Sequence, residues 1–157
     1  MIKYIQMKGI YIMDLKYTSK STNETREIAK KLCAKLNKGD IVVLSGELGS
    51  GKTAFMYGVA EFFGLQDDIS SPTFTIVNEY DTKDLKKIYH LDVYRLEGCD
   101  EFYEIGGNEY LENGICFIEW GRIIQDALPN DCIYVDIQRD EEDIENSRKI
   151  HVYGGKN

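Results

Sequence analysis

Eight consecutive residues, Gly46 to Thr53, form the pattern in this sequence that is tied most closely to one kind of chemistry. They read Gly-Glu-Leu-Gly-Ser-Gly-Lys-Thr and match G-x-x-x-x-G-K-T, the spacing of a loop that cradles phosphate groups. Its glycines lack a Cβ, so the backbone can curl and turn its N–H groups toward phosphate oxygens. Lys52 would reach the outer phosphates, and the Thr53 hydroxyl would ligate the magnesium that they carry. The pattern predicts binding of a nucleoside triphosphate.

The neighbours of this loop supply the strand and the helix that the chemistry requires. The apolar run Ile41–Leu44 predicts a buried strand before the loop, and residues 52–63 predict a helix after it. The N-terminal end of that helix would place a partial positive charge beneath the phosphates. Because all three parts occur in order, we interpret the pattern as functional rather than as a chance glycine-rich turn.

Two acids stand directly after apolar runs that predict further buried strands. Asp92 follows residues 88–91, and Glu119 follows residues 115–118. Ligands of α/β folds bind outside the carboxyl ends of the strands, so both carboxylates should face the phosphates. A triphosphate site needs such an acid to hold magnesium and to position the attacking water. Trp120 comes next, and its position is compatible with either a core side chain or a contact with the ligand.

The rest of the pattern predicts the elements that hold these residues in place. Apolar residues at three- and four-residue spacing predict a helix that starts within 21–25 and stops at the turn 37–40. We expect strands over 74–80, 87–91, 115–118, 132–137 and 149–153, a loop at 70–73, a helix over 100–112 broken at its two glycines, and a charged hairpin tip at 139–143. Together these predict an α/β chain, a three-layer P-loop NTPase fold with a mostly parallel central sheet and a C-terminal antiparallel strand pair.

Length and composition limit the possible classes of protein. A chain of 157 residues fits one domain. We assign residues 13–157 to a single ATPase domain. Because Met13 begins a more ordinary start, residues 1–12 are either an N-terminal extension or the product of an upstream translation start. The net charge of −8 gives no electrostatic footprint for a phosphate backbone, so a partner should hold any nucleic acid. No run approaches the roughly 20 apolar residues that cross a bilayer.

The four cysteines and two histidines lack the spacing of a zinc or redox site. Cys116 and Cys132 lie in apolar runs, where we expect small buried thiols. Reduced cysteines of this kind predict a cytoplasmic location.

One further motif is misleading. Residues 37–40 match N-K-x-D, the motif that reads guanine in GTPases. Here it precedes the first strand, where a turn is needed, and it cannot reach a base held beyond the phosphate-binding loop. No D-x-x-G follows to complete a GTPase set, so GTP specificity has no support.

Taken together, the motifs resemble those of one family over residues 15–137, most of the chain. Besides the phosphate-binding loop they are S-x-x-E-T at 21–25, S-P-T-F at 71–74, H-x-D-x-Y-R at 90–95, E-W at 119–120 and L-P at 128–129. This set resembles the TsaE (YjeE-type) family, bacterial P-loop ATPases of tRNA threonylcarbamoyladenosine synthesis. The loop alone is shared by unrelated proteins, whereas the other motifs together are far more specific.

The resemblance implies a small cytoplasmic ATPase that works with the TsaD and TsaB proteins. Those partners transfer a threonylcarbamoyl group to adenosine 37 of tRNAs that read codons beginning with A. The family member itself would meet tRNA only through the complex, and no membrane is involved.

The resemblance also implies roles for individual residues. Lys52, Asp92 and Glu119 form the expected catalytic set, and Thr53 and Glu119 the expected Mg²⁺ ligands. The expected ATP-binding residues are Thr25 near the base together with Gly49, Ser50, Gly51, Lys52, Thr53, Ala54, Thr73 and Trp120. Ala54 departs from the family, which often has a second threonine there, and removes one hydroxyl near the phosphates.

Two other functions are compatible with a phosphate-binding loop. A small-molecule or nucleotide kinase would need an acceptor site and an arginine-bearing lid, but Arg95, Arg122 and Arg139 are scattered along the chain. A non-enzymatic assembly module would use ATP only to fix its shape. The intact lysine, threonine and two acids argue against lost chemistry, so we predict an Mg²⁺-dependent ATPase that is weak alone and acts within a complex.

Overall fold

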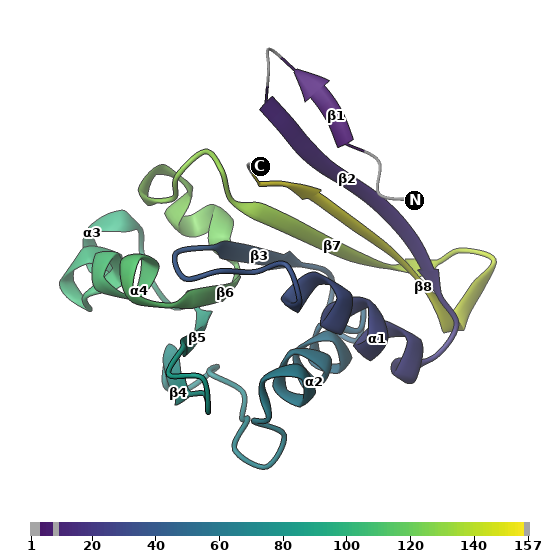
Figure 1. The fold of residues 1–157 in the computed structure, drawn as a ribbon, viewed down its shortest axis with the longest axis horizontal. Helices are drawn as coiled ribbons and strands as arrows, with labels where there is room; N and C mark the ends of the chain where they lie inside the picture. The colour runs from purple at the N-terminus through teal and green to yellow at the C-terminus, as the bar shows by residue number, and fades with distance from the viewer. Residues whose placement is uncertain (1–3, 8–9, 156–157) are drawn as a thin grey trace.

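One 8-stranded sheet runs through the computed structural model, which describes residues 4–7 and 10–155 (Figure 1). In the order in which they lie side by side, its strands are β1 (Tyr4–Met7), β2 (Ile10–Ser19), β8 (Asp143–Gly154), β7 (Ile133–Asp140), β3 (Ile41–Ser45), β6 (Ile115–Glu119), β5 (Lys87–Asp92) and β4 (Val77–Asp81).

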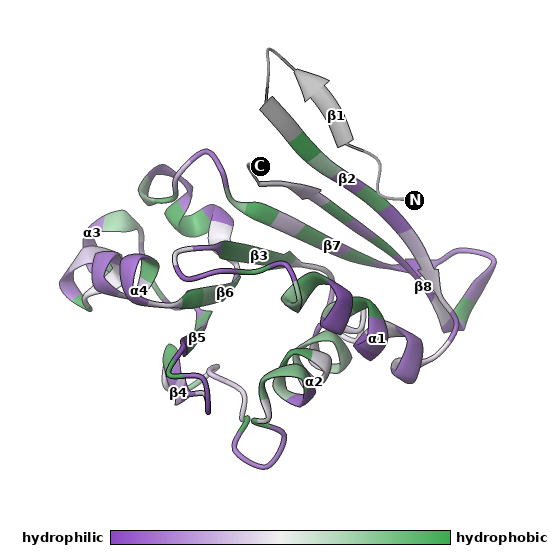
Figure 2. Ribbon diagram, in the orientation of Figure 1, coloured by the Kyte–Doolittle hydropathy of each residue, from purple (hydrophilic) through white to green (hydrophobic). Residues whose placement is uncertain are grey.

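Parallel pairing is confined to the centre of this sheet. Strand β3 is parallel to both β6 and β7, and β6 is parallel to β5. Antiparallel strands flank this centre, with β4 at one edge and β8, β2 and β1 toward the other. Strands β3 and β6 are continuous apolar runs, as expected where both faces are covered (Figure 2). The predicted mostly parallel centre and the antiparallel pair β7–β8 are confirmed.

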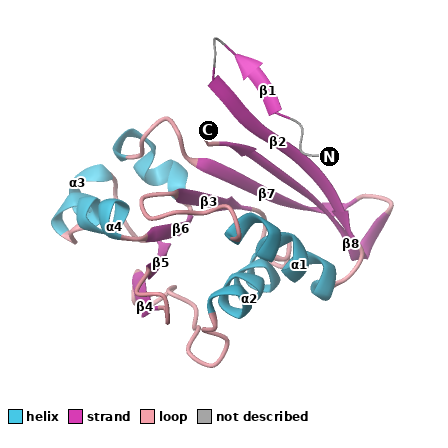
Figure 3. Ribbon diagram, viewed as in Figure 1, coloured by secondary structure: helices cyan, strands magenta, loops and turns pink. Residues whose placement is uncertain are grey.

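Helices cover the sheet on both faces (Figure 3). One face packs against α1 (Thr22–Cys33) and α2 (Lys52–Phe63), and the other against α3 (Cys99–Glu104), α4 (Gly107–Asn113) and the 3₁₀ helix η1 (Gly121–Ala127). Alternate residues of β3 therefore enter separate cores, Val42 and Leu44 on the α1–α2 side and Ile41 and Val43 on the other. The three-layer prediction is confirmed.

Helix α1 begins where its capping residues predict. The Ser21 hydroxyl accepts from the Glu24 amide at 3.1 Å, and the Glu24 carboxylate accepts from the Lys20 amide at 2.7 Å. The helix ends at Cys33, earlier than predicted, although Leu36 is still buried beyond it. Helix α2 has the predicted bounds, and the helix predicted over 100–112 is indeed divided at its glycines into α3 and α4.

One predicted strand is too long. Strand β4 starts at Val77 rather than at Phe74, because the preceding residues turn. The Ile76 amide donates to the Pro72 carbonyl at 2.8 Å, and Ile76 has a φ of 66°, a left-handed conformation that a strand excludes. The charged tip between β7 and β8 lies where predicted, but both strands extend closer to it.

The first part of the chain also joins the sheet. Strand β2 runs across the boundary expected after residue 12 and pairs with β8 from Met13 to Ser19. Residues 1–3 and 8–9 of the expected extension lie outside the described residues. Within the described part of the chain, every helix is too short or too polar to cross a membrane.

Candidate nucleotide-binding site

The loop from Gly46 to Gly51 joins the carboxyl end of β3 to the first residue of α2. Its tight curl depends on Gly46, where an added Cβ would lie 2.6 Å from the Ile137 carbonyl oxygen. The loop closes on itself through the Ser50 amide, which donates to the Glu47 carbonyl at 3.0 Å. The predicted strand–loop–helix unit is therefore present.

The lysine of this loop folds back over it. The ammonium of Lys52 donates to the Gly46 carbonyl at 2.7 Å and lies 4.0 Å from Oε1 of Glu119. It is also 5.7 Å from the centre of the Trp120 ring, within range of a cation–π interaction. The charge of Lys52 is thus held beside the loop, where the outer phosphates of a nucleotide would lie.

Glu119 ends β6 and has a histidine as its nearest partner. Its Oε2 is 3.1 Å from Nε2 of His90, which is buried in β5. Burial opposes the charged form of Glu119, but the hydrogen bond with His90, the charge of His90 and that of Lys52 outweigh it and hold the pKa of Glu119 below its ordinary value. An ionised carboxylate at this point can ligate a cation.

Asp92 ends β5 directly beside Glu119, since the two residues are Cα partners in the parallel register. Its side chain is turned to the loop that precedes β4, because Oδ2 accepts from the Thr73 hydroxyl at 3.4 Å. Its backbone amide donates to the Ile76 carbonyl of the same loop at 2.8 Å, while Oδ1 accepts from the Tyr94 amide at 3.1 Å. The structure thus joins Asp92 to the S-P-T-F segment.

Trp120 lies at the surface of this site rather than in the core. Its side chain is 52% exposed, which rules out the core alternative. It packs against Tyr94, with ring centres 4.9 Å apart. The residue has a φ of 63°, so the chain turns sharply there between β6 and η1.

The remaining expected site residues make fewer contacts with the loop and its acids. Thr53 and Ala54 lie in the first turn of α2, and the side chain of Thr53 is exposed. Thr25 lies in α1 and is buried, with its hydroxyl 2.7 Å from that of Ser19. No interaction joins Thr25 to the phosphate-binding loop within residues 4–7 and 10–155.

Three residues at the site were missed as functional candidates in the sequence. His90 stands in the H-x-D-x-Y-R motif, and its separation of two residues from Asp92 places both on one face of a strand. Arg139 and Arg148 reach the phosphate-binding loop from the β7–β8 hairpin, at the carbonyls of Leu48 and Gly49. Arg139 is distant from the loop in the sequence but close to it in the structure, because the strand order places β7 next to β3.

Two observations at this site fit a nucleoside triphosphate bound with magnesium. The Ser50 hydroxyl is buried in the loop and has no hydrogen-bond partner among the described residues, so it lacks an acceptor that a phosphate oxygen would supply. No group of three or more His, Cys, Asp or Glu in this part of the chain could hold a metal alone. Mg²⁺ does not need three such side chains, because it takes one or two protein carboxylates and completes its coordination shell with phosphates and water.

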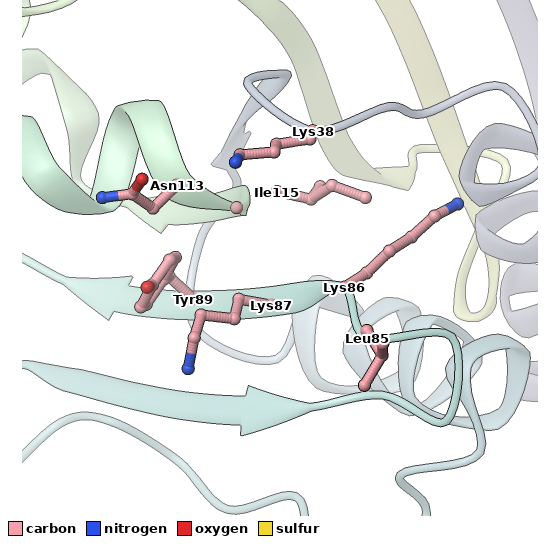
Figure 4. Close-up of a pocket in the computed structure, with 8 residues that line it drawn as sticks. Lys38, Leu85, Lys86, Lys87, Tyr89, Asn113 and Ile115 are labelled. Carbon is pink, nitrogen blue, oxygen red and sulfur yellow. The ribbon is translucent and has the colours of Figure 1, made fainter.

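A separate hollow of about 350 Å³ opens at the amino ends of β5 and β6 (Figure 4). Its lining includes Lys38, Lys86, Lys87 and Tyr89 and none of the expected site residues. Within it, Lys87 is already paired with two carboxylates of β4. The chemistry described above lies at the opposite ends of these strands.

A parallel strand, a curled glycine loop and a helix that starts at the lysine of G-K-T define a P-loop nucleotide-binding protein. The family model described as "Threonylcarbamoyl adenosine biosynthesis protein TsaE" matches residues 19–150. The chain belongs to this TsaE family.

Individual relatives agree with this assignment. The chain is similar to the tRNA threonylcarbamoyladenosine biosynthesis protein TsaE of Bacillus subtilis, with 41% identity over 130 residues that cover 82% of this chain and 80% of that protein. Its identity with the protein of the same name from Treponema pallidum is 35% over 125 residues, covering 79% of this chain and 91% of that one. The crystal structure of Bacillus subtilis YdiB superimposes with a TM-score of 0.70 at 34% identity, over 91% of this chain and 86% of that one.

Proposed function

We propose that this chain is an Mg²⁺-dependent ATPase, weak alone, that is required with TsaD and TsaB for threonylcarbamoyl modification of adenosine 37 in tRNAs reading codons that begin with A. Its family and the names of its relatives support the biosynthetic part of the proposal. The observation that carries the enzymatic part is the placement of Asp92 and Glu119 side by side at the carboxyl ends of adjacent strands, with the ammonium of Lys52 4.0 Å from Glu119.

Each of these side chains has a separate role. Lys52 holds the outer phosphates together with the amides of residues 49–54. Thr53 and Glu119 ligate magnesium, which when bound neutralises charge that develops on the transferred phosphoryl group. Asp92 positions the attacking water, and its hydrogen bond with Thr73 supports this role because it joins the acid to a loop that can respond to the γ-phosphate.

Two residues are proposed to contact other parts of the nucleotide. The exposed ring of Trp120 beside Lys52 supports a contact with bound ATP. Thr25 is proposed to lie near the base, and this role requires its buried hydroxyl to leave Ser19 when ATP binds.

Apolar side chains around the site support the proposed partnership with proteins. Leu48 of the phosphate-binding loop is 96% exposed and Phe74 of the S-P-T-F segment is 82% exposed. Tyr94 and Trp120, which pack against each other, are also exposed. Because large apolar residues grouped at a surface favour protein contacts, and the net charge of −8 disfavours bare RNA, we propose that tRNA is met only through the complex.

The proposed location is the cytoplasm. Cys33, Cys116 and Cys132 are buried free thiols, which supports a reducing compartment. A kinase remains the weaker alternative, and turnover that depends on a small acceptor molecule would favour it.

Reconstitution tests the proposal directly. Purified TsaD, TsaB and unmodified tRNA are combined with the substrates of the transfer, with and without this chain and ATP, and modified adenosine is measured by mass spectrometry. We expect modification to need both the chain and ATP, and Lys52→Ala to remove it, while Lys83→Ala on an exposed turn does not. Equal modification without the chain would refute the proposed role.

A further inference from the structure

The β7–β8 hairpin brings two arginines against the phosphate-binding loop. Arg139 and Arg148 are Cα partners in the antiparallel register, so their side chains leave the same face of the sheet. Nη2 of Arg139 donates to the carbonyl of Leu48 at 3.5 Å, and Nη2 of Arg148 donates to the carbonyl of Gly49 at 3.4 Å. Two guanidinium groups thus contact two successive carbonyls of the loop.

The end of the hairpin is built in a way that directs Arg139. The register shifts between Arg139 and Asp140, and an irregularity of this kind re-aims a side chain. Asp140 is buried and accepts from the Glu142 amide and the Ser147 hydroxyl, each at 3.2 Å. It also forms an ion pair with Lys149 at 3.2 Å. These contacts fix the shape of the hairpin end from which Arg139 reaches the loop.

The two arginines are like charges placed opposite one another in the strand pair. Like charges directly opposite one another destabilise a pair of strands. Neither Arg139 nor Arg148 forms an ion pair with a carboxylate in the described part of the chain. The loop carbonyls of Leu48 and Gly49 are the acceptors that these guanidinium groups have at the loop.

The contacts also set the direction of backbone amides. A trans peptide group points its N–H away from its carbonyl, so Arg139 orients the Gly49 amide and Arg148 orients the Ser50 amide. The motif leaves position 49 open to any residue, yet the left-handed backbone here favours glycine. Gly49 has a φ of 75°, and an added Cβ would lie 2.7 Å from Nη2 of Arg139.

We propose that Arg139 and Arg148 are positioning residues of the phosphate-binding loop. They hold the carbonyls of Leu48 and Gly49, and so aim the Gly49 amide toward phosphate and keep the Ser50 amide in the bond with the Glu47 carbonyl that closes the loop. The proposal rests on the proposed function only for the identity of the anion, the phosphates of ATP.

Two measurements on Arg139→Gln test the proposal, with Lys83→Gln as the control that removes the same charge from an exposed turn. The first is the ¹⁵N–¹H spectrum of the nucleotide-free protein, where we expect the Gly49 amide signal to shift in Arg139→Gln but not in the control. The second is calorimetric titration with ATP and Mg²⁺. We expect binding to weaken about three- to tenfold, the range for one lost hydrogen bond.

Conservative and second-site variants separate charge from geometry. Arg139→Lys keeps the charge but not the planar fork, so it should shift the Gly49 amide while losing less affinity than Arg139→Gln. Arg148→Gln should shift the Ser50 amide, although Arg148 also donates to the Ile144 and Ser147 carbonyls and its loss can loosen the hairpin.

Unchanged amide signals and unchanged ATP affinity in Arg139→Gln would overturn the proposal. If wild-type protein does not bind ATP at all, the proposed function fails, and the amide spectra alone still decide the role of the arginines.

Discussion

The ammonium of Lys52 and the carboxylate of Glu119 lie 4.0 Å apart beside the phosphate-binding loop. Both side chains are mostly buried, so water screens this pair less than a surface pair. A triphosphate with magnesium offers each group a new partner, phosphate for the lysine and metal for the acid. The ion pair therefore holds the ammonium of Lys52 and the carboxylate of Glu119 at the positions where phosphate and metal would bind.

Lys52→Ala should weaken ATP binding by about 10- to 150-fold, because hydrogen bonds to charged groups contribute about 1.5–3 kcal/mol. Calorimetric titration with ATP and Mg²⁺ measures the change. Lys83→Ala serves as the control, since it removes an equal charge from the exposed β4–β5 turn. Equal affinity of Lys52→Ala and wild type would refute the assignment of the loop.

Glu119→Ala should reduce the dependence of nucleotide binding on magnesium, because it removes a carboxylate proposed to ligate the metal directly. Titrations with ATP in Mg²⁺ and in EDTA should differ strongly for wild type and only slightly for the variant. Glu112→Ala, at an exposed position of α4, should behave as wild type. A variant that keeps the full magnesium effect would remove Glu119 from the proposed ligands.

Asp92→Asn should slow ATP hydrolysis by about 100-fold or more while ATP affinity stays close to that of wild type. A positioned acid or base contributes about 10²–10⁴ to a rate, and the amide can no longer accept a proton. Single-turnover hydrolysis and calorimetry separate the two effects, with Asp84→Asn as an exposed control. If magnesium dependence is lost in Asp92→Asn and retained in Glu119→Ala, the two acids exchange roles.

The parts of the site that could be predicted from the sequence depend on local rules. Residues 41–63 encode a strand, a loop and a helix in succession, and the structure confirms all three. Asp92 and Glu119 each follow an apolar strand, so the rule for carboxyl ends of parallel strands places them together, and they are indeed Cα partners.

The parts that were missed depend on pairing between distant segments. The bonds from Arg139 and Arg148 to the loop span 91 and 99 residues, and they exist only because β7 lies next to β3. The contact between His90 and Glu119 needs the parallel register of β5 and β6. Ile76 is β-branched and favours a strand by propensity, yet tertiary bonds hold it at a positive φ.

Thiol reactivity should distinguish the cysteines. Burial raises the pKa of Cys33 and of Cys116 to about 12, and that of Cys132 to about 11. At pH 8 these groups are almost entirely protonated, and thiolate is the reactive form. Only Cys99, which is partly exposed, should react with Ellman's reagent in the native protein, with the rest reacting after unfolding in guanidinium. Cys99→Ser should abolish the native reaction. Rapid native labelling of Cys116 would contradict the buried packing of β6.

ATP should control docking of the protein partners. Triphosphate contacts order loops that carry threonine or backbone ligands, and here the S-P-T-F segment is tied to the site through Thr73 and Asp92. We therefore expect a complex with TsaD and TsaB by size exclusion or light scattering with ATP, and a weaker one with ADP or no nucleotide. Phe74→Ser should weaken this complex and spare ATP affinity, because Phe74 is 82% exposed.

Bare tRNA should bind poorly to a chain of charge −8. Tight, salt-sensitive binding of tRNA alone, with no nucleotide-dependent partner, would instead indicate an enzyme that acts directly on RNA.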